Sequence, residues 1–265
     1  MHRVVFQNCL VYLCFVFGIF LATGLGAESP AQAATPTEPV DPRGVLDEAV
    51  RALGPIDRFD RLPAVRFTGL SGDGESEGAP VDMLMVFPEG LDGLWMQSLF
   101  ENEGTVFDRQ LAGDRSWSKT LGVLPPELHR DAVRYASTKL LTLLRYRHHP
   151  DAEVRLEGIE QVDGEEVRVV RVTLYGHPSY LEVAPSGRVV AVRFPSSDIQ
   201  EQVEDQWVRR TYDDYREVDG FRLPFRQQVT VGGEFYNVWQ LDSLELDPDF
   251  DPAIFEPPAD GSESD

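Results

Sequence analysis

Cysteine is almost missing from this 265-residue sequence, and its two copies, Cys9 and Cys14, both lie in an apolar run near the N-terminus. The remainder of the chain therefore offers no disulfide, no cysteine nucleophile and no cysteine zinc site. Lysine is also scarce, with Lys119 and Lys139 as its only copies. We interpret this scarcity as a bias of genome composition rather than as a functional signal.

Positive charge is in deficit as well. The chain has 24 basic and 45 acidic residues, which gives a formal net charge of −21 at pH 7. A field of this sign repels phosphate backbones and anionic lipid head groups, so nucleic-acid binding is excluded. A basic protein partner is favoured, although the same acidity also serves solubility in salty surroundings.

Signatures of catalysis are absent: the sequence has no G-x-S-x-G, no H-E-x-x-H, no P-loop and no dinucleotide-binding glycine pattern. His148 and His149 are the most conspicuous polar pair, but neighbours on a helix point about 100° apart, and the pair suits a helix C-terminus instead. Asp213 and Asp214 are neighbours on an expected strand, so their carboxylates diverge. We expect no catalytic residue, no metal and no cofactor.

The N-terminus has the pattern of a secretory signal peptide. Arg3 precedes the apolar run, and Ala31-Gln32-Ala33 fits the cleavage site, so residues 1–33 are expected to be removed on export. The alternative is an uncleaved membrane anchor, because the apolar run is nearly long enough to span a bilayer. Residues 34–40 are expected to be a disordered leader and residues 259–265 an acidic tail.

Between these ends the hydrophobic pattern alternates between helix and strand. Asp41-Pro42 predicts the start of a helix that stops at Gly54-Pro55, and short strands follow as far as Trp117. Pro125-Pro126 predicts the start of one long helix with Asp131, Arg134 and Lys139 on its polar side. Strands resume at residue 153 and continue to residue 258. The fold class is α+β, mainly antiparallel β, with a strongly curved sheet or unclosed barrel covered by a helical lid.

The last three strands, over residues 205–258, are the clearest part of the pattern. Asp219-Gly220 and Gly232-Gly233 predict two-residue hairpin turns. In the middle strand Phe221, Leu223 and Phe225 alternate with polar residues, which predicts one apolar face. The four tryptophans either line a ligand cavity or belong to an ordinary core.

The close of the chain resembles a known family. The resemblance begins with Tyr212, Asp214-Tyr215 and Val218-Asp219-Gly220-Phe221-Arg222-Leu223-Pro224-Phe225. It ends with Leu246-Asp247-Pro248, Phe250 and Ile254-Phe255-Glu256-Pro257-Pro258. Over residues 43–258 the chain resembles the LolA/LolB-like superfamily of outer-membrane lipoprotein carriers and sorting proteins. The resemblance implies a domain at 41–258 in the periplasm, whose unclosed barrel binds acyl chains on its concave side. The family's carrier holds its lid shut with an arginine, which we assign to no arginine here.

The resemblance implies a non-enzymatic carrier or binder of lipid or acylated lipoprotein, working as a monomer in transient contact with membrane machinery. The residues expected to line its apolar cavity are Met83, Met85, Phe87, Leu140, Leu144, Val170, Val172, Val192, Phe194, Phe221, Leu223 and Phe225. The first alternative is a protein-interaction or envelope-stress sensor module on the same fold that docks a basic partner. The second is a metal-dependent hydrolase using His148 and His149.

Overall fold

A computed structural model describes residues 40–74, 78–89, 94–102, 105–119, 121–198 and 203–257. The expected signal peptide at 1–33, the expected leader at 34–40 except for Val40, and the acidic tail at 259–265 lie outside these residues. Within the described residues, no helix combines the length and apolar character needed to cross a bilayer.

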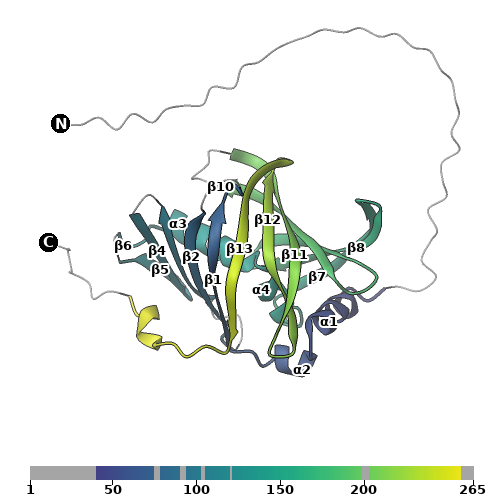
Figure 1. The fold of residues 1–265 in the computed structure, drawn as a ribbon, viewed down its shortest axis with the longest axis horizontal. Coiled ribbons are helices and arrows are strands. Elements are labelled where there is room, and N and C mark those ends of the chain that lie inside the picture. Colours follow the sequence, from purple (N-terminus) through teal and green to yellow (C-terminus); the bar gives the residue numbers. More distant parts are fainter. Residues whose placement is uncertain are drawn as a thin grey trace, which may run out of the picture. The chain divides into compact units, whose positions relative to one another are not determined.

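The described domain is built on one 13-stranded sheet (Figure 1). Its strand order is β6-β5-β4-β3-β2-β1-β13-β12-β11-β10-β9-β8-β7, and every neighbouring pair is antiparallel. The strands are β1 Ala64–Gly72, β2 Ala79–Val86, β3 Trp95–Asn102, β4 Thr105–Ala112, β5 Arg115–Ser118, β6 Gly122–Val123, β7 Glu153–Val162, β8 Glu165–Leu174, β9 His177–Val183, β10 Val189–Asp198, β11 Val203–Val218, β12 Phe221–Val231 and β13 Glu234–Leu246.

The chain enters this sheet at its middle. It runs outward from β1 to the edge strand β6, crosses to the opposite edge at β7, and returns strand by strand until β13 pairs with β1. Because β6 and β7 are not paired to each other, the sheet stays open. The predicted class, a curved antiparallel sheet or unclosed barrel with helices, is therefore confirmed.

Local turn chemistry sets the register of the closing strands. Asp219 and Gly220 both have positive φ, 49° and 79°, and Gly232 and Gly233 follow with 60° and 91°. Two successive residues of this kind make the turn whose twist matches paired strands. Both predicted hairpins are confirmed.

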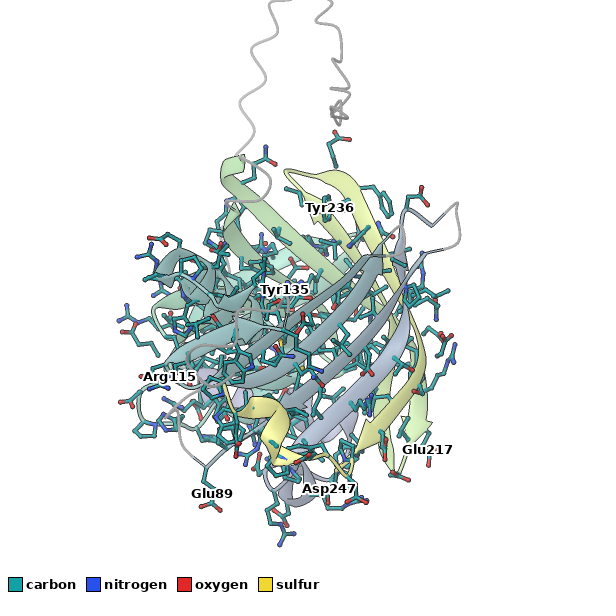
Figure 2. The ribbon with its side chains drawn as sticks, turned by 90° about the vertical axis from the view of Figure 1, so that its left-hand side faces the viewer. Glu89, Arg115, Tyr135, Glu217, Tyr236 and Asp247 are labelled. Carbon is teal, nitrogen blue, oxygen red and sulfur yellow. The ribbon has the colours of Figure 1, made fainter. Side chains whose placement is uncertain are left out.

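The predicted alternation in β12 is present. Phe221, Leu223, Phe225 and Val229 are buried, whereas Arg222 is exposed. In β2 the same alternation divides two cores: Met83 and Met85 face the main core, and Leu84 joins a smaller cluster with Phe255. Figure 2 shows the 3₁₀ helix η1, Pro252–Phe255, lying over the strands from outside.

The first helix, α1, spans Pro42–Leu53 as predicted. Asp41 caps it by accepting a hydrogen bond from the backbone nitrogen of Arg43, at 3.0 Å, and Pro42 occupies the first turn. The helix buries one apolar face in the main core, and α2, Ile56–Phe59, follows directly.

The prediction of one long helix across residues 126–147 is wrong. The structure has two, α3 Pro126–Ser137 and α4 Leu140–Arg145, with Lys139 in an extended conformation between them. The hydroxyls of Ser137 and Thr138 donate to the carbonyls of Arg134 and Tyr135, at 2.9 and 3.1 Å. Such side-chain bonds compete with the helix ladder and favour its end. Both helices lie inside the curve of the sheet (Figure 1).

Candidate functional site

A hollow remains between helix α4 and the concave face of strands β1, β2, β11, β12 and β13. Its cavity volume is about 70 Å³, within a depression of about 590 Å³ that includes open solvent. The lining is mostly apolar, and consists of Phe67, Met85, Lys139, Leu140, Leu141, Tyr212, Leu223, Pro224, Phe225, Arg226, Gln227, Trp239, Leu241 and Leu244. An apolar concavity with a few polar groups is the usual form of a small-molecule site.

Lys139 reaches this hollow from the break between α3 and α4. The sequence placed it on the solvent side of a helix, but the residue is only 6% exposed. Its ammonium lies over the ring of Tyr135 at 3.7 Å and over the ring of Trp239 at 4.8 Å. Burial, and secondarily the charge of Arg210, lower the pKa of Lys139 well below its usual value.

Arg210 on β11 is a second cation beneath the helices, and it is 5% exposed. Its guanidinium donates to the carbonyl and to the hydroxyl of Thr138, at 3.1 Å each. The same group lies over the rings of Phe194 and Tyr135, at 4.5 and 5.6 Å. Arg210 therefore joins the sheet to the lid at the point where the lid is broken.

Two phenols lie close to these cations. Tyr212 of β11 is buried and Tyr135 of α3 is partly buried, and this burial raises the pKa of each to about 12. Both are therefore neutral at physiological pH. The hydroxyl of Tyr212 is buried and has no hydrogen-bond partner within the described part of the chain. A buried hydroxyl of this kind costs free energy unless a ligand or water satisfies it.

No carboxylate contacts these cations in the described residues. The groups that act on Lys139 are its own burial and Arg210, and those that act on Arg210 are burial, Tyr212 and Tyr135. Arg226, the other cation on the lining, already pairs with Asp213 at 2.8 Å. Lys139 and Arg210 are thus buried basic groups that no described carboxylate contacts.

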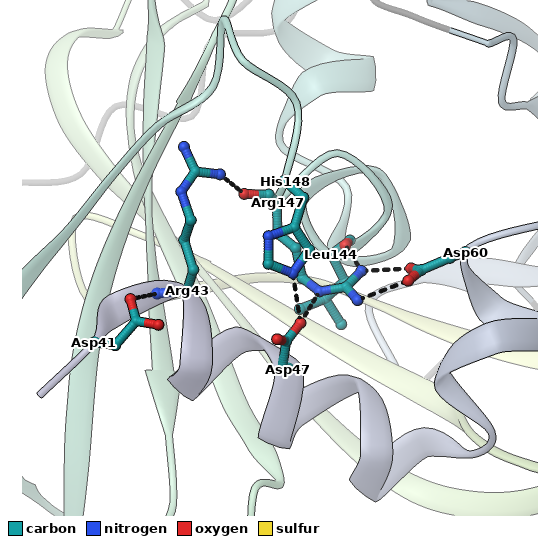
Figure 3. A network of polar contacts seen from close by, with 7 residues as sticks. All are labelled: Asp41, Arg43, Asp47, Asp60, Leu144, Arg147 and His148. Carbon is teal, nitrogen blue, oxygen red and sulfur yellow. Dashed lines mark hydrogen bonds and ion pairs between the residues drawn. The ribbon is translucent and has the colours of Figure 1, made fainter.

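The far end of the lid is fixed to helices α1 and α2 by a buried ion-pair network (Figure 3). Arg147, 1% exposed, pairs with Asp47 at 2.6 Å and with Asp60 at 2.7 Å. It also donates to the carbonyl of Leu144 at 2.8 Å. The lid is therefore held firmly after α4 and more lightly at the α3–α4 break.

The histidine pair follows helix α4, and each ring has a polar contact nearby. The Nε2 atom of His148 lies 2.8 Å from Asp47, within the same network, and Nδ1 of His149 accepts from the backbone nitrogen of Asp151 at 3.2 Å. No group of three or more metal-ligating side chains is found in the described residues. Asp213 pairs with Arg226, whereas Asp214 pairs separately with Arg216 at 2.6 Å.

The residues expected to line the cavity are all buried, but the structure separates them. Met85, Leu140, Leu223 and Phe225 line the hollow. The others pack in the main core around it: Met83, Phe87, Leu144, Val170, Val172, Val192, Phe194 and Phe221. Of the tryptophans, Trp239 lines the hollow, Trp117 joins the smaller cluster, Trp95 packs on Phe255, and Trp207 is half exposed.

Sequence reasoning missed Lys139, Arg210 and Tyr212. A signal existed for two of them, because Val208, Arg210 and Tyr212 recur at every second position of β11 and so share one face. The arginine within that apolar row marks a cation turned inward. Lys139 gave no such signal, since its burial follows from the helix break.

The fold and the hollow define an open-barrel protein with a helical lid, and solved structures share this architecture. A DUF1329 family protein from Desulfovibrio piger matches with a TM-score of 0.52 and 15% identity, over 82% of this chain and 98% of that one. A putative outer membrane lipoprotein-sorting protein domain from Vibrio parahaemolyticus matches with a TM-score of 0.50 and 14% identity, over 81% and 95%. No protein-family model matches the sequence, and no curated protein does. The LolA-like resemblance is confirmed for the fold.

Proposed function

We propose that this protein is an exported, non-enzymatic carrier that binds acyl chains of lipid or lipoprotein in the hollow beneath α3 and α4, in the periplasm. The observation that carries the proposal is the apolar hollow left open between α4 and the concave face of the sheet. Its fold is shared with a protein described as a putative lipoprotein-sorting domain, which supports the same direction.

The energetics suit this task. Each acyl methylene exposed to water costs about 0.8 kcal/mol, so a 16-carbon chain costs on the order of 12 kcal/mol. A carrier in water must offset that cost with a continuous apolar surface. Met85, Leu141 and Leu244 supply such a surface from three different elements, and methionine adapts to irregular shapes.

Loading also requires the hollow to open. The α3–α4 break provides a natural hinge, because Lys139 there is extended and the helix ladder is interrupted. The contacts of Arg210 with Thr138 and two aromatic rings hold this hinge, while the Arg147 network anchors the chain after α4. The lid would therefore move at α3 and its junction rather than at the anchored end.

The test is displacement of a neutral fluorescent probe, N-phenyl-1-naphthylamine, by acyl ligands, combined with mass spectrometry of solvent extracts of the purified protein. Leu244→Trp fills the hollow and should weaken probe binding at least tenfold. Leu70→Trp, on an exposed position of β1, is the matched control and should not. An absence of lipid in the extracts together with no probe binding would reject the carrier function.

The acidity favours one second candidate, a protein-interaction or sensor module that docks a basic partner. The formal net charge of −21 is the observation behind it. A partner recovered from periplasmic extract at low salt and released at high salt, with no lipid bound, would support this candidate over the carrier.

A further inference from the structure

Polar and apolar groups share the lining of the hollow. Lys139 and the unpartnered hydroxyl of Tyr212 both lie on its wall, and Arg210 is close enough to Lys139 for its charge to act on it. The wall contributed by Leu141, Leu244 and Phe67 is apolar. We propose that the ligand is a single-chain amphiphile with a carboxylate head, whose head group binds Lys139 and Tyr212 and whose tail follows the apolar wall. This inference rests on the proposed carrier function and names its ligand class.

The charge balance of the protein is the first argument. The chain has 45 acidic residues against 24 basic ones, so a cation in it has many carboxylates available. Exposed and half-buried arginines are duly paired, as Arg66 is with Asp82 and Arg193 with Glu160 and Glu182. Lys139 and Arg210 lack such a partner among the described residues. Burial disfavours the charged form of a lysine that has no anionic partner, and buried charges are normally paired, so the missing anion is expected from the ligand.

The geometry of Lys139 is the second argument. Tyr135 and Trp239 present their ring faces to its ammonium, which is a favourable contact for a cation but consumes none of its three N–H donors. A carboxylate can accept from the ammonium and from the Tyr212 hydroxyl together. Charge-assisted bonds of this kind are the stronger class of hydrogen bond.

The same contacts should make the affinity for a fatty acid differ from that for an acyl ester or amide. Acyl chains that end in an ester or amide carry no charge at the chain head, so they would leave the ammonium and the hydroxyl incompletely satisfied. The loss of one charged hydrogen bond corresponds to at least a tenfold loss of affinity. A free carboxylate should therefore bind tighter than its own methyl ester.

The experiment measures palmitate and methyl palmitate by displacement of N-phenyl-1-naphthylamine from the purified protein at pH 7.5. Palmitate should bind at least tenfold more tightly to the wild type. Lys139→Met should abolish this preference, and Tyr212→Phe should reduce it about three- to tenfold. Lys119→Met, which changes the other, exposed lysine, is the matched control and should retain it.

The outcomes separate the two proposals. Equal affinities for acid and ester in the wild type, or a preference that persists in Lys139→Met, would overturn the head-group assignment and leave the carrier function standing. Tighter binding of lysophosphatidylglycerol than of palmitate would overturn the carboxylate in favour of a phosphate head. Binding of neither acid, ester nor probe would reject the carrier function itself. Circular dichroism and thermal melting of each variant confirm that it is folded.

Discussion

Arg210 on strand β11 donates both to the backbone carbonyl and to the hydroxyl of Thr138, at 3.1 Å each, and so ties the sheet to the break in the lid. Arg210 is buried, and its guanidinium lies over one ring from the sheet, Phe194, and one from the lid, Tyr135.

We predict that Arg210→Met loosens the lid without unfolding the domain. The substitution removes two hydrogen bonds to Thr138, but it also removes a buried cation whose desolvation is costly. Global stability should therefore change by less than about 2 kcal/mol, while amide hydrogen exchange at residues 138–141 should quicken at least tenfold. Arg222→Met, on the exposed face of β12, is the control, and equal exchange in both variants would contradict the role of Arg210.

The opposite result is expected at the anchored end of the lid. Arg147 satisfies Asp47, Asp60 and the carbonyl of Leu144. Arg147→Met leaves two carboxylates close together without their cation, so the free energy of unfolding should fall by about 3 kcal/mol. Urea denaturation measures the loss. Arg51→Met, on the exposed side of α1, should change it by no more than about 0.5 kcal/mol.

The same network predicts a pH dependence through Asp47. Burial alone would raise the pKa of this carboxyl, but hydrogen bonds from Arg147 and His148 outweigh it, and the folded-state pKa lies below 3.8. A depressed carboxyl pKa contributes stability that is present above the unfolded value of 3.8 and is lost as pH falls through the folded value.

Asp47→Asn should therefore be less stable than wild type at pH 6, and the difference should shrink as pH falls below about 4. Urea denaturation at several pH values between 2 and 6 measures this difference in the free energy of unfolding. Asp249→Asn, at an exposed position, provides the control. A difference that stays constant across this range would show that the ionised form of Asp47 does not contribute.

The sequence predicted the sheet well because its signals there are local. Positive-φ dipeptides such as Asp219-Gly220 and the alternation of Phe221 with Arg222 act within a few residues. The helix break could not be predicted in the same way. Ser137 and Thr138 are compatible with a helix, and Thr138 also accepts a hydrogen bond from Arg210, which arrives from β11 more than 70 positions later.

The candidate site was predicted only in its apolar part for a related reason. Leu140 and Leu223 follow hydrophobic periodicity, and the structure places both on the lining of the hollow. Lys139 breaks the usual rule that lysine stays exposed. The scarcity of lysine in the chain was interpreted as genome bias, so the position of Lys139 in the site was not predicted. Burial of such a cation depends on the packing of α3, β11 and β13 together, which no local pattern encodes.

The last prediction concerns protons taken up on binding. In the free protein the pKa of Lys139 is lowered by burial and by Arg210, and the groups facing it are Tyr135 on α3, Tyr212 and Arg210 on β11, and Arg226 on the β12 wall. The pKa of each phenol is raised to about 12, so both are neutral, and Lys139 is the group free to change. A carboxylate placed beside its ammonium raises the lysine pKa.

At a pH between the lowered pKa of Lys139 in the free protein and its raised pKa in the complex, binding of palmitate must therefore draw a proton from the buffer. The affinity for palmitate must weaken as pH rises through this range. Isothermal titration calorimetry in phosphate and in Tris, whose ionisation enthalpies differ, measures the uptake directly. The wild type should show net uptake, and Lys139→Met none. Equal proton uptake by both proteins would mean that another group titrates on binding, and it would contradict the contact between the carboxylate and Lys139.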